Sequence, residues 1–161
     1  TMSKNAVVKG TTLSGLWHRF EGLPGGKTLF SILVGRSARY TGSIGARVEH
    51  LETGRGVVTM RDSAKVRNHL KSVHAIALMN LGEFATGATV MYQVDGKGRG
   101  ILKGIGMEYL KKARGTITAT CEAAVPSTAG KHDLEVQGNL TDASGDIVAK
   151  VNATWRIDIF E

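Results

Sequence analysis

Cysteine and proline are almost missing from this sequence: its 161 residues include one cysteine and two prolines. The single cysteine, Cys121, excludes a disulfide bond within the chain, so a reducing, cytoplasmic compartment is expected. Long apolar runs are missing as well, because polar residues interrupt even the most hydrophobic stretch, residues 72–94. No membrane-spanning helix is therefore expected, since a span needs about 20 consecutive apolar residues.

Acidic residues are the scarcer charged class, with 14 Asp and Glu against 21 Lys and Arg, which leaves a formal charge of +7. Such an excess favours acidic partners, among them nucleic acid, anionic membrane surfaces and phosphate-bearing ligands. The basic residues are dispersed and form no cluster interleaved with aromatic residues, so nucleic-acid binding is not expected. Lys4, Lys9 and Arg19 precede the first acid, Glu21, a pattern weakly typical of a targeting segment. The mitochondrial matrix is therefore the alternative location.

The hydrophobic residues that are present, 42% of the chain, follow two periods. Residues 11–21 and 28–40 show helical spacing, and so does one long, nearly uncharged segment from about Ser72 to Met91. Strand-like alternation marks residues 44–52, 56–62, 100–110, 114–125, 133–141 and 147–159. A helix without a polar face is buried on all sides. We therefore predict an α+β fold in which a curved antiparallel sheet wraps around the long helix.

The predicted elements divide the chain into a helical extension, residues 1–42, and a main unit, residues 43–161. Within the main unit, Glu83 is the only formally charged residue between Lys71 and Asp95. Burial without a partner disfavours its ionised form and raises its proton affinity, toward the range in which a base works near neutral pH. The alternative is a structural carboxylate held by Asn80 and a backbone N–H.

His74 precedes Glu83 by nine positions, which on a continuous helix means about half a turn and about 13.5 Å of rise. The two side chains therefore cannot reach one substrate atom from the same chain. If both act in catalysis, one of them comes from a second subunit, and a two-fold dimer is part of the site. Alternatively, His74 only begins a helix that Ser72 caps. The spacing of His69 and His74 is poor for zinc, so no metal site is expected.

The pattern Asn68-x5-His74-Ala75-x7-Glu83 resembles the hotdog-fold acyl-CoA thioesterases, and the run from Tyr109 to Gly115 before a strand strengthens the likeness. The resemblance covers roughly residues 43–160 and is closest to the paaI-like branch and to a single-domain relative described only as a domain of unknown function. It implies a hotdog fold, hydrolysis of acyl-CoA thioesters to free acid and CoA, and a homodimer or a dimer of dimers.

The resemblance also implies roles for individual residues. Glu83 matches the helix carboxylate that acts as general base on water or as nucleophile toward the thioester carbonyl. His74 matches the histidine contributed by the opposite subunit, and Asn68 stands where better-studied members have a side-chain amide, usually Gln. Ala75 stands where those members have Gly, whose backbone N–H polarises the thioester oxygen.

The sequence departs from the family pattern at Gly87, where many members have a Ser or Thr that helps to hold the water. Thr86 is adjacent but about 100° away around the helix. The alternative function is therefore a non-catalytic acyl-CoA or lipid-binding hotdog protein. The Asp and His pair of the hotdog hydratases is not found here.

CoA carries phosphates, and the excess of positive charge on this protein is suited to binding them. Candidates for contacts with these phosphates are Lys111, Lys112 and Arg114, which flank a predicted strand. No cofactor is expected, because CoA is part of the substrate.

Overall fold

The computed structural model describes residues 12–161. Lys4 and Lys9, on which the targeting-segment hypothesis depends, lie outside these residues. Three helices come first: α1 (Leu13–Phe20), α2 (Gly26–Ser37) and α3 (Arg39–Gly42). The remaining elements are β1 (Arg47–Glu52), β2 (Arg55–Met60), the short 3-10 helix η1 (Ala64–Val66), α4 (Ala75–Val94), β3 (Gly98–Tyr109), β4 (Ile117–Glu122), β5 (Gly130–Thr141) and β6 (Ile147–Ile159).

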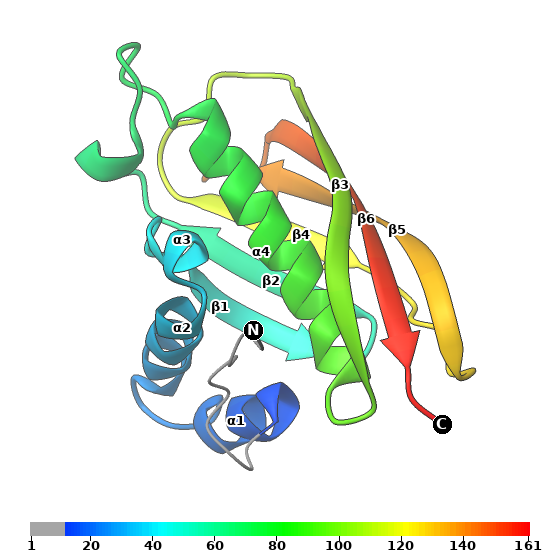
Figure 1. Cartoon of the computed structure of the whole chain (residues 1–161). Helices are drawn as coiled ribbons and strands as arrows, with labels where there is room; N and C mark the ends of the chain where they lie inside the picture. Colours follow the sequence, from blue (N-terminus) through cyan, green and yellow to red (C-terminus); the bar gives the residue numbers. More distant parts are fainter. Residues whose placement is uncertain (1–11) are drawn as a thin grey trace.

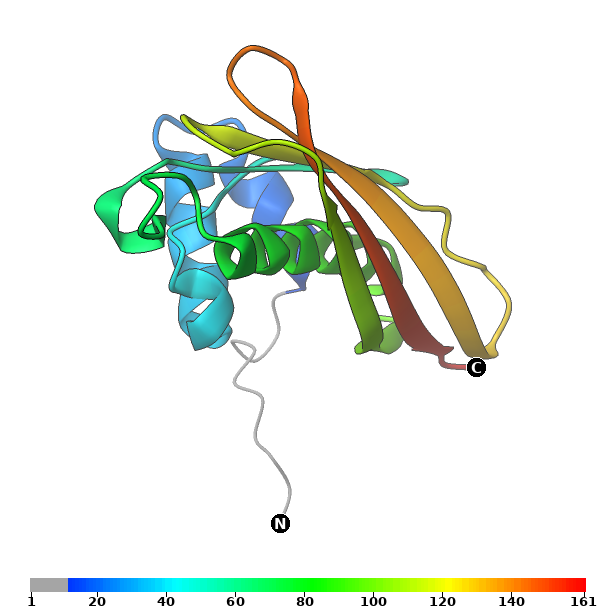
Figure 2. The same cartoon turned by 90° about the horizontal axis from the view of Figure 1, so that it is seen from above.

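The six strands form one antiparallel sheet in the order β1-β2-β4-β5-β6-β3. The sheet curves around α4, which lies along its concave side, while α1, α2 and α3 lie together next to β1 (Figures 1 and 2). The predicted α+β architecture, a curved antiparallel sheet around one long helix, is confirmed. None of the helices in residues 12–161 has the length and hydropathy that a bilayer crossing requires.

Small residues on α4 allow the sheet to approach closely. A Cβ added at Gly82 would lie 2.9 Å from side-chain atoms of Val151 and Met107. On β6 the alternate residues from Ala149 to Ile159 are buried, as the sequence period predicts. Cys121 is buried in β4, and burial raises the pKa of its thiol to about 12. Cys121 is therefore a core residue with an unreactive thiol.

Helix α4 begins at Ala75, later than the predicted Ser72. The reason is that hydrogen bonds to other segments of the same chain hold the residues just before the helix in an extended conformation. The Val73 N–H donates to the Ala113 carbonyl and the His74 N–H donates to the Val66 carbonyl, each at 2.8 Å. In a helix that began at Ser72, these two N–H groups would belong to the first turn and would have no acceptor within the helix.

The two edges of the sheet differ. At the β1 edge, the Ser31 hydroxyl of α2 accepts the Val48 N–H at 2.9 Å, and Lys27 Nζ donates to the Glu49 carbonyl at 2.7 Å. Trp17 of α1 is fully buried and packs edge-on against Phe30 of α2, which fixes this helical cover. The twelve-residue strand β3 forms the other edge, and no element within residues 12–161 pairs with its outer side.

Candidate functional site

Glu83 points from α4 into a cavity of 340 Å³ between α3, α4 and the edge strand β3. The side chain is half-buried. The walls are mostly apolar, and the lining residues are Tyr40, Thr41, Ile76, Met79, Asn80, Leu102 and Ile105. A carboxylate that opens into an apolar hollow of this size is placed to meet a small uncharged group of a ligand.

Burial raises the pKa of the Glu83 carboxyl above its ordinary value. The Thr41 hydroxyl, which lines the same cavity, acts in the opposite direction, because its interaction with the carboxylate stabilises the ionised form. The direction of the net shift agrees with the sequence argument. Glu83 therefore has the stronger basicity that a proton acceptor near neutral pH needs.

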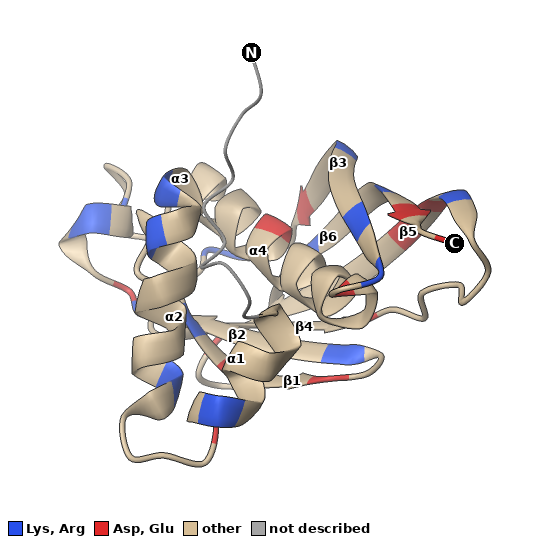
Figure 3. Cartoon of the chain, turned by 60° about the horizontal axis from the view of Figure 1, so that its bottom comes forward, with Lys and Arg blue, Asp and Glu red and all other residues tan. Residues whose placement is uncertain are grey.

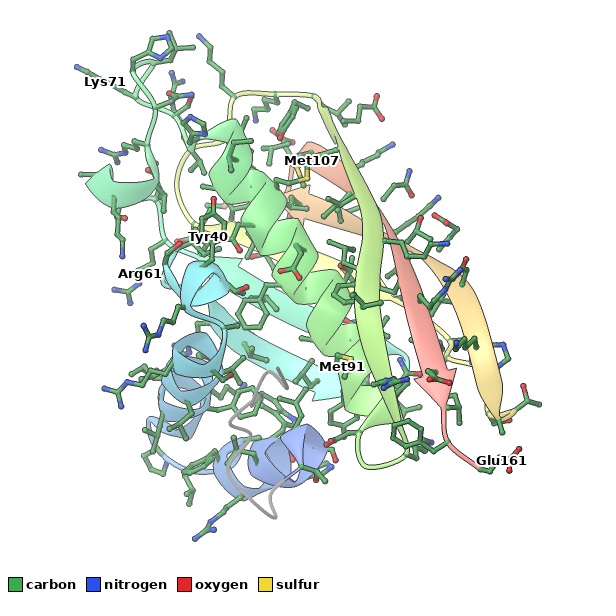
Figure 4. All side chains as sticks on the ribbon, viewed as in Figure 1. Tyr40, Arg61, Lys71, Met91, Met107 and Glu161 are labelled. Carbon is green, nitrogen blue, oxygen red and sulfur yellow. The ribbon has the colours of Figure 1, made fainter. Side chains whose placement is uncertain are left out.

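Thr41 belongs to the four-residue helix α3, and a hydrogen bond from Asn80 holds this helix against α4. Asn80 Nδ2 donates to the Tyr40 carbonyl at 3.1 Å, and Figure 4 shows Tyr40 between α3 and α4. Asn80 therefore anchors α3. The alternative interpretation of the sequence, in which Asn80 holds the Glu83 carboxylate, is wrong for this side chain. Sequence reasoning missed Thr41, since a four-residue helix has no periodicity of its own.

Trp155 explains the glycine at position 87. A Cβ on Gly87 would lie 2.9 Å from the Trp155 ring, so no side chain fits there without moving a buried aromatic residue. The Trp155 Nε1–H donates to the Thr86 hydroxyl at 3.1 Å, and that hydroxyl donates to the Glu83 backbone carbonyl at 3.0 Å. Neither position supplies a hydroxyl to the Glu83 carboxylate, whereas Thr41 lines the same cavity as Glu83.

Substitution Gly87→Ser is expected to destabilise the protein by about 1–3 kcal/mol, the usual effect of overpacking a filled core. The added atoms must displace the Trp155 ring. Urea unfolding followed by fluorescence measures the change. Gly104→Ala is the matched control, because a Cβ at Gly104 meets no atom within 4 Å. Equal stability of the two variants would contradict the steric explanation.

His74 is the N-cap residue of α4, and its Nδ1 accepts the Ile76 N–H at 3.0 Å. This bond leaves Nε2 to carry the proton of a neutral ring and to donate outward. The alternative interpretation of His74 as a residue that begins the helix is therefore confirmed. Its second part is wrong, because the helix cap is His74 itself and not Ser72. No acceptor for the Ala75 N–H lies within the described residues, and the Tyr109 hydroxyl donates to the Ala75 carbonyl at 2.8 Å.

Asn68 organises the loop before α4. Its Oδ1 accepts the Leu70 N–H at 3.0 Å, the Ser72 N–H at 3.2 Å and the Ser72 hydroxyl at 3.1 Å. Within residues 12–161 no hydrogen bond joins Asn68 to Glu83. Asn68 and His74 therefore lie together at the start of α4, apart from Glu83.

The three basic residues expected to contact CoA lie beyond β3. Lys111 Nζ is 2.9 Å from Asp142 and 2.5 Å from Asp146, and these bonds raise the pKa of the lysine. Lys112 and Arg114 are exposed. The pKa of Asp62 is lowered mainly by its hydrogen bond with Arg67, and the charge of Arg114 adds to this effect. The positive charge of Lys111 is thus already compensated, and contacts of all three residues with CoA stay a prediction.

Known proteins of this fold match the chain. One solved structure, described as that of genomics APC5556, has a TM-score of 0.78 at 27% identity and covers 91% of this chain and 98% of its own. PA5026 from Pseudomonas aeruginosa, described as of unknown function and a probable thioesterase, has a TM-score of 0.71 at 23% identity, covering 85% and 97%. A mutant of the thioesterase SAV0944 from Staphylococcus aureus has a TM-score of 0.65 at 20% identity, covering 74% and 98%.

PA5026 and SAV0944 are named as thioesterases and share this fold, so the resemblance to the hotdog superfamily is confirmed at the level of fold. No curated protein matches the sequence. A family model, described as a domain of unknown function (DUF4442), matches residues 26–157 and thus includes α2 and α3 as well as α4 and the sheet. Because this match extends over most of the chain, the protein belongs to the DUF4442 family, with the fold of the hotdog thioesterases.

Proposed function

We propose that this protein hydrolyses acyl-CoA thioesters to a free acid and CoA, with Glu83 as the catalytic carboxylate. The observation that carries the proposal is the position of Glu83, a half-buried carboxylate of raised pKa in an apolar cavity. Solved neighbours of the same fold that are named as thioesterases support it.

The reaction needs an acceptor for a proton of water and a donor for the carbonyl oxygen. Glu83 takes the proton while the water oxygen adds to the thioester carbon. The Ala75 N–H at the start of the partner's α4 stabilises the resulting oxyanion, helped by the positive end of the helix dipole. When the tetrahedral intermediate collapses, the carbon–sulfur bond breaks and Glu83 returns the proton to the sulfur. Alternatively, Glu83 attacks the carbonyl carbon itself, the carbon–sulfur bond breaks and CoA leaves as a thiolate that takes a proton from solvent. Water then cleaves the anhydride to the free acid and the Glu83 carboxylate.

A homodimer is part of the proposal, because Ala75 and His74 lie about 12 Å and about 13.5 Å along the helix from Glu83. The unpaired edge of β3 gives a second copy a place to add to the sheet. This edge lies next to the catalytic cavity, since Leu102 and Ile105 of β3 line it. Exposed apolar side chains border the same region, among them Tyr40 and Ile76. Pairing of two β3 strands would cover these side chains and bring the two sites close to the interface.

Thiol release from a panel of acyl-CoAs of increasing chain length tests the proposal, with CoA binding measured in parallel by calorimetry. We expect steady thiol release for at least one acyl group. If the protein binds CoA but releases no thiol at any chain length, the proposed activity is wrong and the non-catalytic acyl-CoA binding protein is the better description.

Thr41→Val is expected to lower kcat/KM about tenfold, the typical effect of losing one hydrogen bond to a charged group. It should also move the acid limb of the pH–rate profile to higher pH, because the Thr41 hydrogen bond lowers the pKa of Glu83. A pH–rate profile on a good substrate measures both effects. Thr41→Ser keeps the hydroxyl and should restore the parent profile. An unmoved acid limb in the valine variant would contradict a positioning role for Thr41.

A further inference from the structure

A second hollow, a groove of about 1,040 Å³, lies between α2, α3 and the strands β1 and β2. It is more than large enough for a phosphate-bearing group. Its lining includes one carboxylate, from Glu49, and four guanidinium groups, from Arg36, Arg39, Arg47 and Arg61.

Most of this positive charge is uncompensated. Glu49 accepts the Thr59 hydroxyl at 2.9 Å and lies 3.5 Å from Arg47 Nε. The other three arginines form no ion pair within residues 12–161. The sequence has no acidic residue between Glu21 and Glu49. All charged residues on α2 and α3 are therefore basic, as Figure 3 shows.

Close backbone packing brings the arginines to one groove. A Cβ on Gly42 would lie 2.4 Å from the Gly35 carbonyl oxygen, so these glycines allow α3 to fold back directly onto α2. Arg36 and Arg39, on the two helices, therefore line the same hollow. Arg61 follows β2 and lies beside α3 (Figure 4).

The groove and the Glu83 cavity lie on opposite sides of α3. Arg39 and Gly42 line the groove, whereas Tyr40 and Thr41, between them in sequence, line the cavity. On α4, Phe84 lines the groove and its neighbour Glu83 lines the cavity. A ligand with its reactive end at Glu83 would have to extend past α3 for its far end to reach the arginines.

We propose that the arginine groove binds the phosphates of the CoA portion of the substrate; this inference rests on the proposed thioesterase function. Guanidinium groups bind phosphate oxygens in bidentate fashion and stay charged at any physiological pH. The uncharged, flexible pantetheine arm of CoA connects these phosphates to the thioester. The Lys111 ammonium, already placed between Asp142 and Asp146, offers less to an incoming phosphate.

The test compares two thioesters of the same acyl group, one on CoA and one on pantetheine, which lacks phosphates. In the triple variant Arg36→Gln, Arg39→Gln, Arg61→Gln we expect KM for the CoA thioester to rise at least about tenfold with kcat kept. The kinetic constants for the pantetheine thioester should not change. A control triple variant, Arg19→Gln, Lys97→Gln, Lys131→Gln, removes the same charge from outside the groove and should leave both substrates unaffected.

Calorimetric binding of CoA, dephospho-CoA and inorganic phosphate separates this inference from the proposed activity. Weaker CoA binding in the groove variant supports the groove even if the parent hydrolyses no thioester. CoA binding that is unchanged in the groove variant, or weakened instead by Lys112→Gln with Arg114→Gln, overturns it. Inorganic phosphate binding that is as tight as CoA binding would make the groove a general anion site and also overturn the assignment to CoA.

Discussion

Substitution Glu83→Gln is expected to lower kcat for thioester hydrolysis by about 10²–10⁴, the usual contribution of a general base. The amide has nearly the shape of the carboxylate and keeps the contact with Thr41, but it accepts no proton from water. Thiol release under saturating substrate measures the loss. In the parent, kcat/KM should fall as the pH drops through the raised pKa of Glu83, because the protonated carboxyl is inactive.

The same variant should be more stable than the parent at neutral pH. Burial raises the folded-state pKa of Glu83 above its unfolded value, so its stabilising contribution is complete only at low pH. That contribution is lost as the pH rises through the folded-state pKa, and the ionised side chain then opposes folding. We expect Tm of Glu83→Gln to exceed that of the parent by roughly 2–4 °C at pH 7–8, with the difference shrinking toward pH 4. A less active variant without the gain in Tm would argue against desolvation as the cause.

Mixed dimers test the shared site most directly. Glu83→Ala chains should be nearly inactive alone, and so should His74→Ala chains, because His74 caps the helix start that presents the Ala75 N–H to the partner's site. A purified dimer that contains one chain of each kind has one intact site, if Glu83 works with the His74 of the other subunit. Such a mixed dimer should regain about half of the parent activity, because one of its two sites is complete. Co-expression with two affinity tags gives the mixed dimers, and thiol release measures them.

The reciprocal pairing is the control. A parent chain combined with the double variant Glu83→Ala, His74→Ala contains no complete site if the residues come from different chains. It contains one complete site if they act within one chain. Activity in this second dimer and none in the first would therefore contradict the shared site, as would a protein that stays monomeric at assay concentration.

The fold was largely predictable because its signals are local. The alternation in residues 147–159 gives β6 with its observed bounds. The absence of a polar face on α4 predicts that the sheet wraps around it. Glu83 was predictable as a candidate for the same reason, because one carboxylate in an apolar helix is conspicuous against its surroundings. The expectation of burial on all sides is wrong, because Ile76 is exposed and Glu83 is half-buried where α4 lines the cavity.

The parts that sequence reasoning missed depend on contacts between distant segments. Thr41 lines the Glu83 cavity on a helix that Asn80, forty positions away, binds through the Tyr40 carbonyl. The start of α4 is set by the Ala113 and Val66 carbonyls. Lys111 pairs with two aspartates from the turn before β6. The residues next to Lys111 in the sequence do not predict these ion pairs. No local pattern encodes such contacts, so spacing alone could not supply them.

The difference between the two sheet edges has a consequence for how many copies can assemble. Side chains of α2 already satisfy backbone groups of β1, so strand addition there would have to displace a helix. In the proposed dimer, each copy uses its β3 edge on the other, and a two-fold axis leaves no further open strand of this kind. Growth through edge pairing thus stops at two chains. The protein can keep a long, glycine-rich edge strand without the fibre formation that such a strand invites in a sheet open on both sides.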